Sequence, residues 1–473
     1  MTRLIALITW AAAIWLIRRD TAGRVGVSTA LWIPTLWAGI LISRPLSAWV
    51  GFGGGAGGAA SMEGSPLDAL FYFAMIVASG IILSRRNVNW SEVISSGWPI
   101  FLFYGYLLLS VLWAESSIVS FKRWFKDFGN IVVALVILTE ANPVQAIRAV
   151  FLRCAYIFLP LSVVFIRYFP ELGRRYNIHS GELEAIGVTF QKNSLGVMIL
   201  ICSLVIIWEW IERSKDEQIA NTWLERCLRY LPPGLLFCGA YLLHLSDSKT
   251  SITALLLGGC VLVSAKLPLL RERIGAFGAY TIVGILCFWA LDSLFGIKES
   301  IVSGMGRDMT FTGRTDVWRE LLSLNTDPII GTGFCSFWSN NYYLAKLPEW
   351  VGFSAHNGYL ETYIDGGFIA IFFLTVMLLA VGLRINSKLV DGGNYALFRF
   401  AVLLVMIVAN FSESHFGRMS PLGFVFLLAA LDPPWSEQAV ADGFEDEDKD
   451  EELAGSPVPL VAGDMAPAVG HFA

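Results

Sequence analysis

The sequence predicts an all-α integral membrane protein that crosses the bilayer many times. Of its 473 residues, 55% are apolar and only 15% are charged, and the mean hydropathy is +0.60. Soluble domains usually carry about 25% charged residues. More than ten apolar stretches of about 14–27 residues alternate with short charged loops, which is typical of a bundle of transmembrane helices. A single soluble domain, a disordered chain and a fibrous protein are therefore excluded.

The lengths of the apolar stretches predict about 12–13 transmembrane helices. The expected ranges are 3–17, 28–42, 67–83, 98–113, 125–139, 146–168, 191–210, 231–245, 250–265, 275–294, 357–383, 397–410 and 419–431. Several are shorter than the roughly 20 residues of a perpendicular span, so tilted or partly re-entrant helices are expected. The first range is followed by Arg18-Arg19-Asp20 and by no small-residue cleavage site, so we expect a retained helix.

Charge and composition divide the chain into three parts. We expect N-terminal transmembrane helices over 1–190, a functional core over 191–432 and an acidic tail over 433–473. Residues 436–473 hold ten acidic residues and one Lys, and segment 442–452 (DGFEDEDKDEE) cannot bury apolar area. The tail is therefore expected to be disordered. The seven cysteines show no CxxC spacing, so the sequence indicates neither a zinc site nor a disulfide framework.

The distribution of basic residues predicts the orientation of the helices. Loops on one side of the predicted bundle, including 18–24, 85–86, 213–229, 266–273 and 384–388, carry fifteen Lys and Arg residues, whereas those on the other side carry nine. The more basic side is cytoplasmic by the positive-inside rule. The C-terminal tail is then cytoplasmic, and the hydrophilic segment 296–355 lies on the outer face.

The outer segment 296–355 is the longest stretch that the sequence places outside the bilayer, and loops of this length usually have a function. Residues 313–324 (GRTDVWRELLSL) have helical apolar spacing and end before Asp327-Pro328, so a short helix is expected. The turn-rich GTGF (331–334) and an aromatic run over 337–350 follow. The next span opens with SAHNGYLETYIDGGF (354–368).

Four polar clusters lie at the outer ends of predicted spans, where charge is costly unless it is paired or functional. They are Gln191-Lys192-Asn193, the Ser246–Thr250 turn with Lys249, Arg314, and His356-Asn357 with Glu361 one helical turn beyond. Cations and a histidine on one face favour an anion at the lipid surface, such as a lipid-linked diphosphate. Each also has an ordinary interpretation: Lys192 as a snorkelling residue, Lys249 as a partner of Asp247, Arg314 as a loop residue and His356 as a helix start.

These clusters carry a family resemblance. GRTDVW, GTGF and HNGYLETYIDGGF, in that order, resemble the C-terminal signature of the O-antigen ligase and polysaccharide polymerase superfamily of bacterial inner-membrane proteins. TFQKNSLG (189–196) and LSDSKTSITALLL resemble its Asn-x-x-Gly and Ser-x-[Arg/Lys] elements. The resemblance covers about 190–370, and the order and outer placement of the elements agree with the family.

The resemblance implies a GT-C-like, metal-independent and inverting glycosyltransferase without a cofactor. Its donor would be an undecaprenyl-diphosphate-linked oligosaccharide, used on the periplasmic side. By carry-over, Arg314 holds the diphosphate and His356 orients or deprotonates the acceptor hydroxyl, while Lys192, Asn193, Lys249, Asn357 and Glu361 bind donor or glycan. Many ligases have Arg at the position of Lys249, and Lys keeps the charge without the bidentate geometry.

Several functions remain open at this stage. Polymerisation of an exopolysaccharide or O-antigen chain is the first choice, because QKNSLG resembles the exopolysaccharide-polymerase branch. Ligation onto lipid A core, oligosaccharide transfer onto protein, and a transporter without covalent chemistry are the alternatives. A flippase and a chain-length regulator are possible partners beside the membrane lipids. The Gly-rich run 51–58 lacks the GK[ST] ending of a phosphate loop, and no basic patch indicates nucleic acid.

Overall fold

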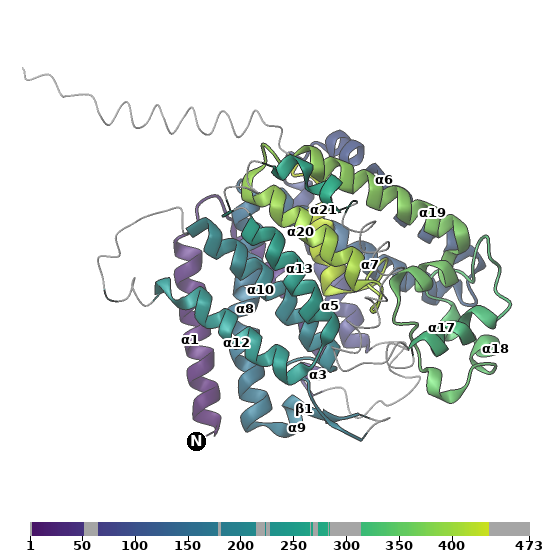
Figure 1. Cartoon of the computed structure of the whole chain (residues 1–473), viewed down its shortest axis with the longest axis horizontal. Helices are drawn as coiled ribbons and strands as arrows, with labels where there is room; N and C mark the ends of the chain where they lie inside the picture. Colours follow the sequence, from purple (N-terminus) through teal and green to yellow (C-terminus); the bar gives the residue numbers. More distant parts are fainter. Residues whose placement is uncertain are drawn as a thin grey trace, which may run out of the picture.

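The computed structural model describes residues 2–51, 65–177, 181–213, 223, 228–264, 266–267, 273–281, 283 and 314–434. These residues form a bundle of helices with one two-stranded ribbon (Figure 1). The principal helices are α1 (Thr2–Ala22), α2 (Trp32–Ile42), α5 (Pro66–Ser84), α6 (Trp90–Ser110), α7 (Ser117–Leu138), α8 (Pro143–Tyr168), α10 (Lys192–Arg213), α12 (Leu231–Ser246), α13 (Lys249–Ser264), α17 (Arg314–Ser323), α19 (Gly358–Ser387), α20 (Gly393–Ala409) and α21 (Pro421–Ala430). The predicted all-α membrane architecture is confirmed.

Shorter elements connect these helices. They are the 3-10 turns η1 (Thr29–Leu31), η2 (Val111–Trp113), η3 (Ile274–Ala276), η4 (Phe337–Ser339) and η5 (Glu349–Val351), the one-turn helices α3 (Leu46–Trp49), α9 (Pro170–Gly173) and α18 (Asn341–Leu344), and the strands β1 (Arg174–Tyr176) and β2 (Leu183–Ala185). The strands are antiparallel, with Arg175 opposite Glu184. Each predicted span coincides with a helix except 275–294, most of which lies outside the described residues, as does the tail 436–473.

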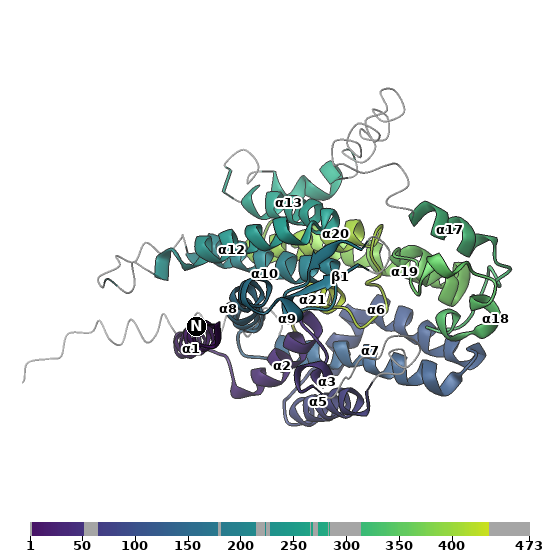
Figure 2. The same ribbon diagram turned by 90° about the horizontal axis from the view of Figure 1, so that it is seen from below.

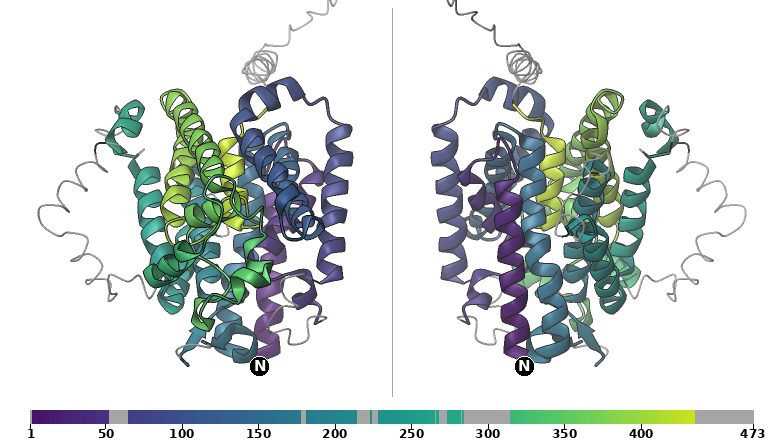
Figure 3. Two further views of the ribbon diagram at one scale, coloured as in Figure 1. Left: turned by 90° about the vertical axis from the view of Figure 1, so that its right-hand side faces the viewer. Right: turned by 90° about the vertical axis from the view of Figure 1, so that its left-hand side faces the viewer.

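Among the described residues, five helices are long and apolar enough to cross a membrane: α5, α6 with η2, α8, α10 and α19. Helices α8 and α10 are the most enclosed of the five, whereas α5 is almost wholly uncovered along its length. The ribbon views show α5 at the edge of the bundle and α10 among other helices (Figures 2 and 3). Leu70, Phe73 and Val77 of α5 are exposed, as expected for a helix that faces lipid.

The core is shared by the two predicted parts of the membrane region. Helix α8 packs on α1, α2, α10 and α12, and α10 packs on α13. One apolar cluster joins buried residues of α7 and α8 with those of α10, α20 and α21. The ranges 1–190 and 191–432 thus contribute to the same core.

The loops fall into two groups at opposite ends of the bundle. Arg86, before α6, donates hydrogen bonds to Thr139, between α7 and α8, and Arg24 donates to Gln145 at the start of α8. At the other end, Arg44, after α2, donates to the carbonyl of Thr189, before α10. Each of these contacts joins two loops that the sequence places on the same side of the bundle. The structure therefore pairs these loops as the sequence predicts.

The outer segment is fastened to α19 at a break in that helix. Gly367 has φ 62° and ψ −160°, which interrupts the helix and frees backbone groups. The amides of Thr332 and Gly333 donate to the carbonyls of Ile364 and Asp365, and the amide of Phe368 donates to the carbonyl of Pro328. The GTGF and IDGGF motifs are therefore joined by backbone hydrogen bonds, and α17 and α18 lie beside the N-terminal end of α19 (Figure 1).

Candidate functional site

One carboxylate collects three of the residues that the sequence singled out. Glu413 lies in the loop between α20 and α21. Its Oε1 accepts a hydrogen bond from Asn193 Nδ2 at 2.8 Å and pairs with Arg314 Nη2 at 3.1 Å. Its Oε2 lies 3.6 Å from His356 Nδ1. The starts of α10, α17 and α19, far apart in the sequence, thus meet at one acidic side chain.

A glycine sets the position of Glu413 relative to His356. The amide of Gly358 donates to the carbonyls of both Asn410 (2.8 Å) and Glu413 (2.9 Å). A Cβ at Gly358 would lie 2.0 Å from Oδ1 of Asn410, so a side chain there would displace the 410–413 loop. Asn357 caps α19 by accepting hydrogen bonds from the amides of Tyr359 and Leu360. This cap places His356 just outside the helix, in a left-handed conformation with φ 48°.

The starts of α10 and α13 join the same region. A Cβ at Gly196 of α10 would come within 3 Å of the side chains of Ser248 and Ser251, so the two elements touch there. Thr250 Oγ1 and Ser412 Oγ are 2.6 Å apart, which ties the α12–α13 turn to the loop that carries Glu413. The four polar clusters predicted from the sequence therefore meet around one loop, 410–413. Glu361 is the exception, because its side chain lies elsewhere.

A cavity of about 260 Å³ opens beside this group. Its lining residues are Arg175, Asn177, Glu184, Phe190, Gln191, Lys192, Asn193 and His356. Lys192 Nζ is 2.9 Å from Glu184 Oε1 and a third of its side chain is exposed, so it can exchange this partner for a ligand. The cavity combines two cations, three amides, an imidazole and the carboxylate of Glu184 with the aromatic ring of Phe190. The cations and amides suit an anionic ligand that carries a carbohydrate.

The electrostatics keep Glu413 ionised. Burial raises the pKa of Glu413, but the neighbouring His356 and the charge of Arg314 more than offset burial, so the pKa lies below its ordinary value. Arg314 uses Nη2 for this pair, while its Nη1 is buried and has no hydrogen-bond partner among the described residues. A buried guanidinium donor without a partner is uncommon and is ready to bind an oxyanion.

The remaining predicted residues lie in different settings. Lys249 Nζ is 2.7 Å from Asp247 Oδ1, and Asp247 is itself mostly exposed. Glu361 is buried on another side of the His356 turn. It accepts hydrogen bonds from Trp338 Nε1 (3.0 Å) and the amide of Ala355 (2.8 Å), and it pairs with Arg418 at 3.0 Å. The Glu361 side chain is thus engaged in holding the outer segment, and Asn357 in capping α19.

Sequence reasoning missed two residues, Glu413 and Arg418. Arg418 pairs with both Glu361 and Asp365, at 2.7 Å from the latter, and contacts Cys335 of the outer segment. Burial lowers the pKa of Arg418, but the charges of Asp365 and Glu361 outweigh it and raise the pKa. The available signal was the run SESHFGR (412–418), which places one acid, one histidine and one arginine in a short loop between two predicted spans. Among the described residues, no group of three or more His, Cys, Asp or Glu side chains could hold a metal ion.

Two comparisons with known proteins give matches to this chain. Residues 234–375 match the family model described as O-antigen ligase. The chain is also 23% identical over 328 residues to the exopolysaccharide production protein ExoQ of Rhizobium meliloti (strain 1021), a match that covers 64% of this chain and 70% of that protein. Both matches point to the O-antigen ligase and polysaccharide polymerase superfamily. The resemblance inferred from the motifs is thereby confirmed. The region matched by the family model contains Lys249, Arg314 and His356, while Glu413 lies beyond it.

Proposed function

We propose that this chain is a glycosyltransferase of the bacterial inner membrane that polymerises a glycan carried on undecaprenyl diphosphate, at the periplasmic face and with its C-terminus in the cytoplasm. The supporting observation is the single carboxylate of Glu413, which holds Arg314 and His356 together beside a cavity. A phosphate-binding cation and a proton acceptor in contact with one buried anion form a pair suited to leaving-group departure and nucleophile activation.

In this mechanism Arg314 stabilises the leaving group. The acceptor hydroxyl oxygen attacks the anomeric carbon of the donor sugar, and the bond between that carbon and the diphosphate oxygen breaks. Negative charge then builds up on the diphosphate. The unpartnered Nη1 of Arg314 can donate to a diphosphate oxygen while Nη2 stays paired with Glu413, so the charge is met by a donor that is already oriented. Attack from the face opposite to the leaving group inverts the anomeric centre, without a metal ion.

His356 takes the proton of the acceptor. With Nδ1 directed at Glu413, the imidazole is held as the tautomer that carries its proton on Nδ1, and Nε2 is the acceptor. The proton of the attacking hydroxyl passes to Nε2, and the ionised Glu413 stabilises the imidazolium that forms. The left-handed backbone at His356 keeps the ring outside α19, where it lines the cavity.

Lys192, Asn193 and Lys249 bind the substrates in this proposal. Lys192 and Asn193 line the cavity with His356, so they contact the donor glycan or its first phosphate. Lys249, at the α12–α13 turn, is paired with the exposed carboxylate of Asp247 and supplies a mobile point charge to the diphosphate. Asn357 and Glu361 act on the substrates through the loop that they position.

Polymerisation is favoured over ligation to lipid A core because the relative that matches 64% of the chain is named for exopolysaccharide production. Loss of a polymerase leaves single repeats on the lipid anchor, whereas loss of a ligase leaves bare core, so surface glycans resolved by size after gene disruption separate the two functions.

The direct test uses purified protein and a lipid-diphosphate glycan, with turnover and lipid binding measured on wild type and His356→Ala. We expect turnover to fall by about 10²–10⁴-fold, the usual contribution of a positioned acid or base, while lipid binding is retained. Loss of binding in parallel with turnover would assign His356 to the diphosphate site, and wild-type turnover in the variant would refute the mechanism.

A further inference from the structure

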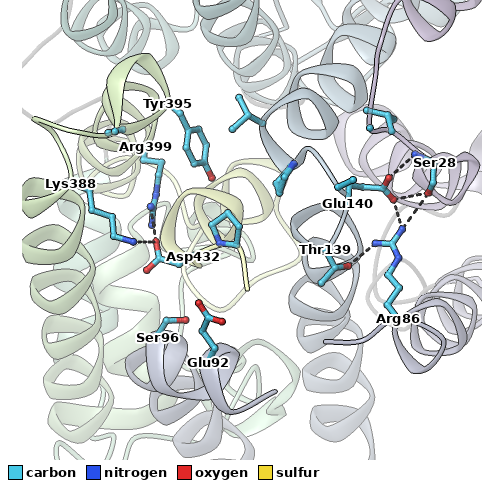
Figure 4. A pocket seen from close by; sticks show the side chains of 18 of the residues that line it. Ser28, Arg86, Glu92, Ser96, Thr139, Glu140, Lys388, Tyr395, Arg399 and Asp432 are labelled. Atoms are coloured by element: carbon cyan, nitrogen blue, oxygen red, sulfur yellow. Dashed lines mark hydrogen bonds and ion pairs between the residues drawn. The ribbon is translucent and has the colours of Figure 1, made fainter. Parts of the chain in front are cut away.

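A second cavity, of about 1220 Å³, lies at the other end of the bundle from Glu413. His356 precedes the first residue of α19, whereas Lys388, which lines this cavity, follows its last residue, so the 30-residue helix separates the two places. Figure 4 shows the cavity between the α7–α8 turn on one side and the end of α19 with α20 on the other. No part of the proposed transfer reaction uses it.

One wall of this cavity is electrically balanced. Arg86 pairs with Glu140 and donates to Thr139 Oγ1 at 2.6 Å. Glu140 also accepts hydrogen bonds from the amide and the hydroxyl of Ser28, at 2.6 and 2.8 Å. Arg86 and Glu140 therefore have their partners, and the dashed lines of Figure 4 show this group around Glu140. Glu92 also lines the cavity and adds a further negative charge.

The opposite wall carries an excess of positive charge. Asp432, just after α21, is the carboxylate around which Arg384, Lys388 and Arg399 gather, with nitrogen–oxygen distances of 3.4, 3.4 and 2.7 Å. Burial raises the pKa of Asp432, but these three cations lower it below its ordinary value, so it stays ionised. One negative charge among these three positive ones leaves an excess of two, which Glu92, also lining the cavity, reduces to one positive charge overall.

Arg399 supplies an unused donor there. Its Nε donates to the carbonyl of Ala429 at 2.6 Å and its Nη1 contacts Asp432, while its Nη2 is buried without a hydrogen-bond partner among the described residues. The side chain is only 4% exposed, so bulk water does not compensate for the missing bond. A guanidinium N–H group that lacks a hydrogen-bond acceptor beside a cavity favours the binding of an anion.

We propose that this cavity is a binding site for a phosphate-bearing ligand, with the phosphate held by the guanidinium of Arg399 and by Lys388 Nζ. A guanidinium fork and a neighbouring ammonium are the donors that phosphate oxygens prefer. Lys388 is half exposed, so it can turn from Asp432 to the ligand.

The size and walls of the cavity specify the rest of the ligand. A cavity of about 1220 Å³ is far larger than one phosphate, and small-molecule sites usually span about 300–1,000 Å³. Val27, Val144 and Ala396 give it apolar wall as well as charge. An organic phosphate with an apolar or ring-bearing part fits, either as the headgroup end of an anionic lipid or as a soluble phosphate ester. Both present the same chemistry to Arg399.

The experiment uses the full chain in phosphatidylcholine nanodiscs, with thermal unfolding (Tm) and native mass spectrometry as readouts. One arm adds inorganic phosphate, against chloride at equal ionic strength. The other replaces part of the phosphatidylcholine by phosphatidic acid. Variants are Arg399→Gln and Lys388→Ala, with Arg85→Ala as the matched control, because Arg85 is exposed in the α5–α6 turn and does not line the cavity.

We expect phosphate or phosphatidic acid to raise Tm in wild type and Arg85→Ala, and each cavity variant to need about tenfold more ligand, as for the loss of one charged hydrogen bond. A response to free phosphate identifies a soluble ligand and a response to phosphatidic acid alone identifies a lipid; either supports the site. Should Arg399→Gln fail to fold, Lys388→Ala alone decides the outcome. Equal responses in all variants, or no response in either arm, would overturn the proposal. So would binding seen only after deletion of 436–473, because the acidic segment would then be the resident anion.

Discussion

Replacing Glu413 by Gln should stop glycan transfer while leaving the protein folded. Gln keeps the length of the side chain, and its amide oxygen can still accept the hydrogen bond that Asn193 donates at 2.8 Å. It removes the negative charge that lies 3.1 Å from Arg314 Nη2 and 3.6 Å from His356 Nδ1. The substitution therefore removes the charge of Glu413 and keeps the size of its side chain, so any loss of activity can be assigned to the charge.

Two effects set the expected magnitude. Without the carboxylate, His356 loses the group that fixes its tautomer and stabilises its imidazolium, and in other enzymes an amide at such a position lowers turnover by up to about 10⁴-fold. Arg314 also loses its partner, and its side chain is only 14% exposed. Breaking a buried ion pair costs about 3–5 kcal/mol, and the partial exposure of this pair reduces the cost. We expect turnover to fall at least about 100-fold, with a modest loss of stability.

The assay compares release of polymer from a lipid-diphosphate glycan with the Tm of the same preparation. Glu413→Asp, which keeps the charge on a shorter side chain, should recover part of the rate, and Glu171→Gln serves as a control because Glu171 is an exposed acid of the same face, in α9. Wild-type turnover in Glu413→Gln, with donor binding unchanged, would refute the role of this carboxylate. Equal loss in Glu413→Asp and Glu413→Gln would show that geometry rather than charge is responsible.

Substitutions at three further positions test the surroundings of Glu413. Arg314→Ala should abolish polymer formation at normal membrane levels, and Arg314→Lys should recover little, because one point donor cannot contact Glu413 and a phosphate at once; glycan size in a complemented null strain measures both. Burial lowers the pKa of His415 to about 4, so on acidification from about pH 6.5 to 4 the unfolded chain takes up a proton that the folded chain does not, and stability falls with pH. His415→Gln should flatten Tm over that range, and an unchanged pH profile would contradict the neutral, buried state. Gly358→Ala should lower both Tm and turnover, because its Cβ would lie 2.0 Å from Asn410 Oδ1, whereas Gly105→Ala, with nothing within 4 Å, should change neither.

Hydropathy was sufficient to predict the bundle because a span must be about 20 apolar residues long whatever its neighbours are. The same reasoning located the short helix α17, whose apolar spacing and following Asp327-Pro328 are local signals. The break in α19 at Gly367 was not predicted. It depends on the backbone of Ile329, which would lie 2.2 Å from a Cβ at that position, and this is a contact between segments almost forty residues apart.

The site was predicted in part for a similar reason. Asn193 and His356 could be named because each lies at an outer end of a predicted span, where a polar residue is conspicuous, and Arg314 because it lies in the predicted helix of the outer segment. Glu413 lies at such an end too, but only the packing of Gly358 against the 410–413 loop brings it to His356. Sequence spacing gives the ends of helices, whereas contacts between loops decide which of those ends meet.

The different position of Glu361 follows from how α19 begins. The expectation that Glu361 shares a face with Asn357 requires both residues to be helical. Asn357 is instead the N-cap, with extended backbone and a side chain turned onto the amides of Tyr359 and Leu360. Glu361, in the first turn, points to Trp338 and Arg418, and Arg418 stands in the same loop as Glu413. Glu361 therefore influences the site indirectly. It anchors both the outer segment and the loop that presents Glu413 to Arg314 and His356.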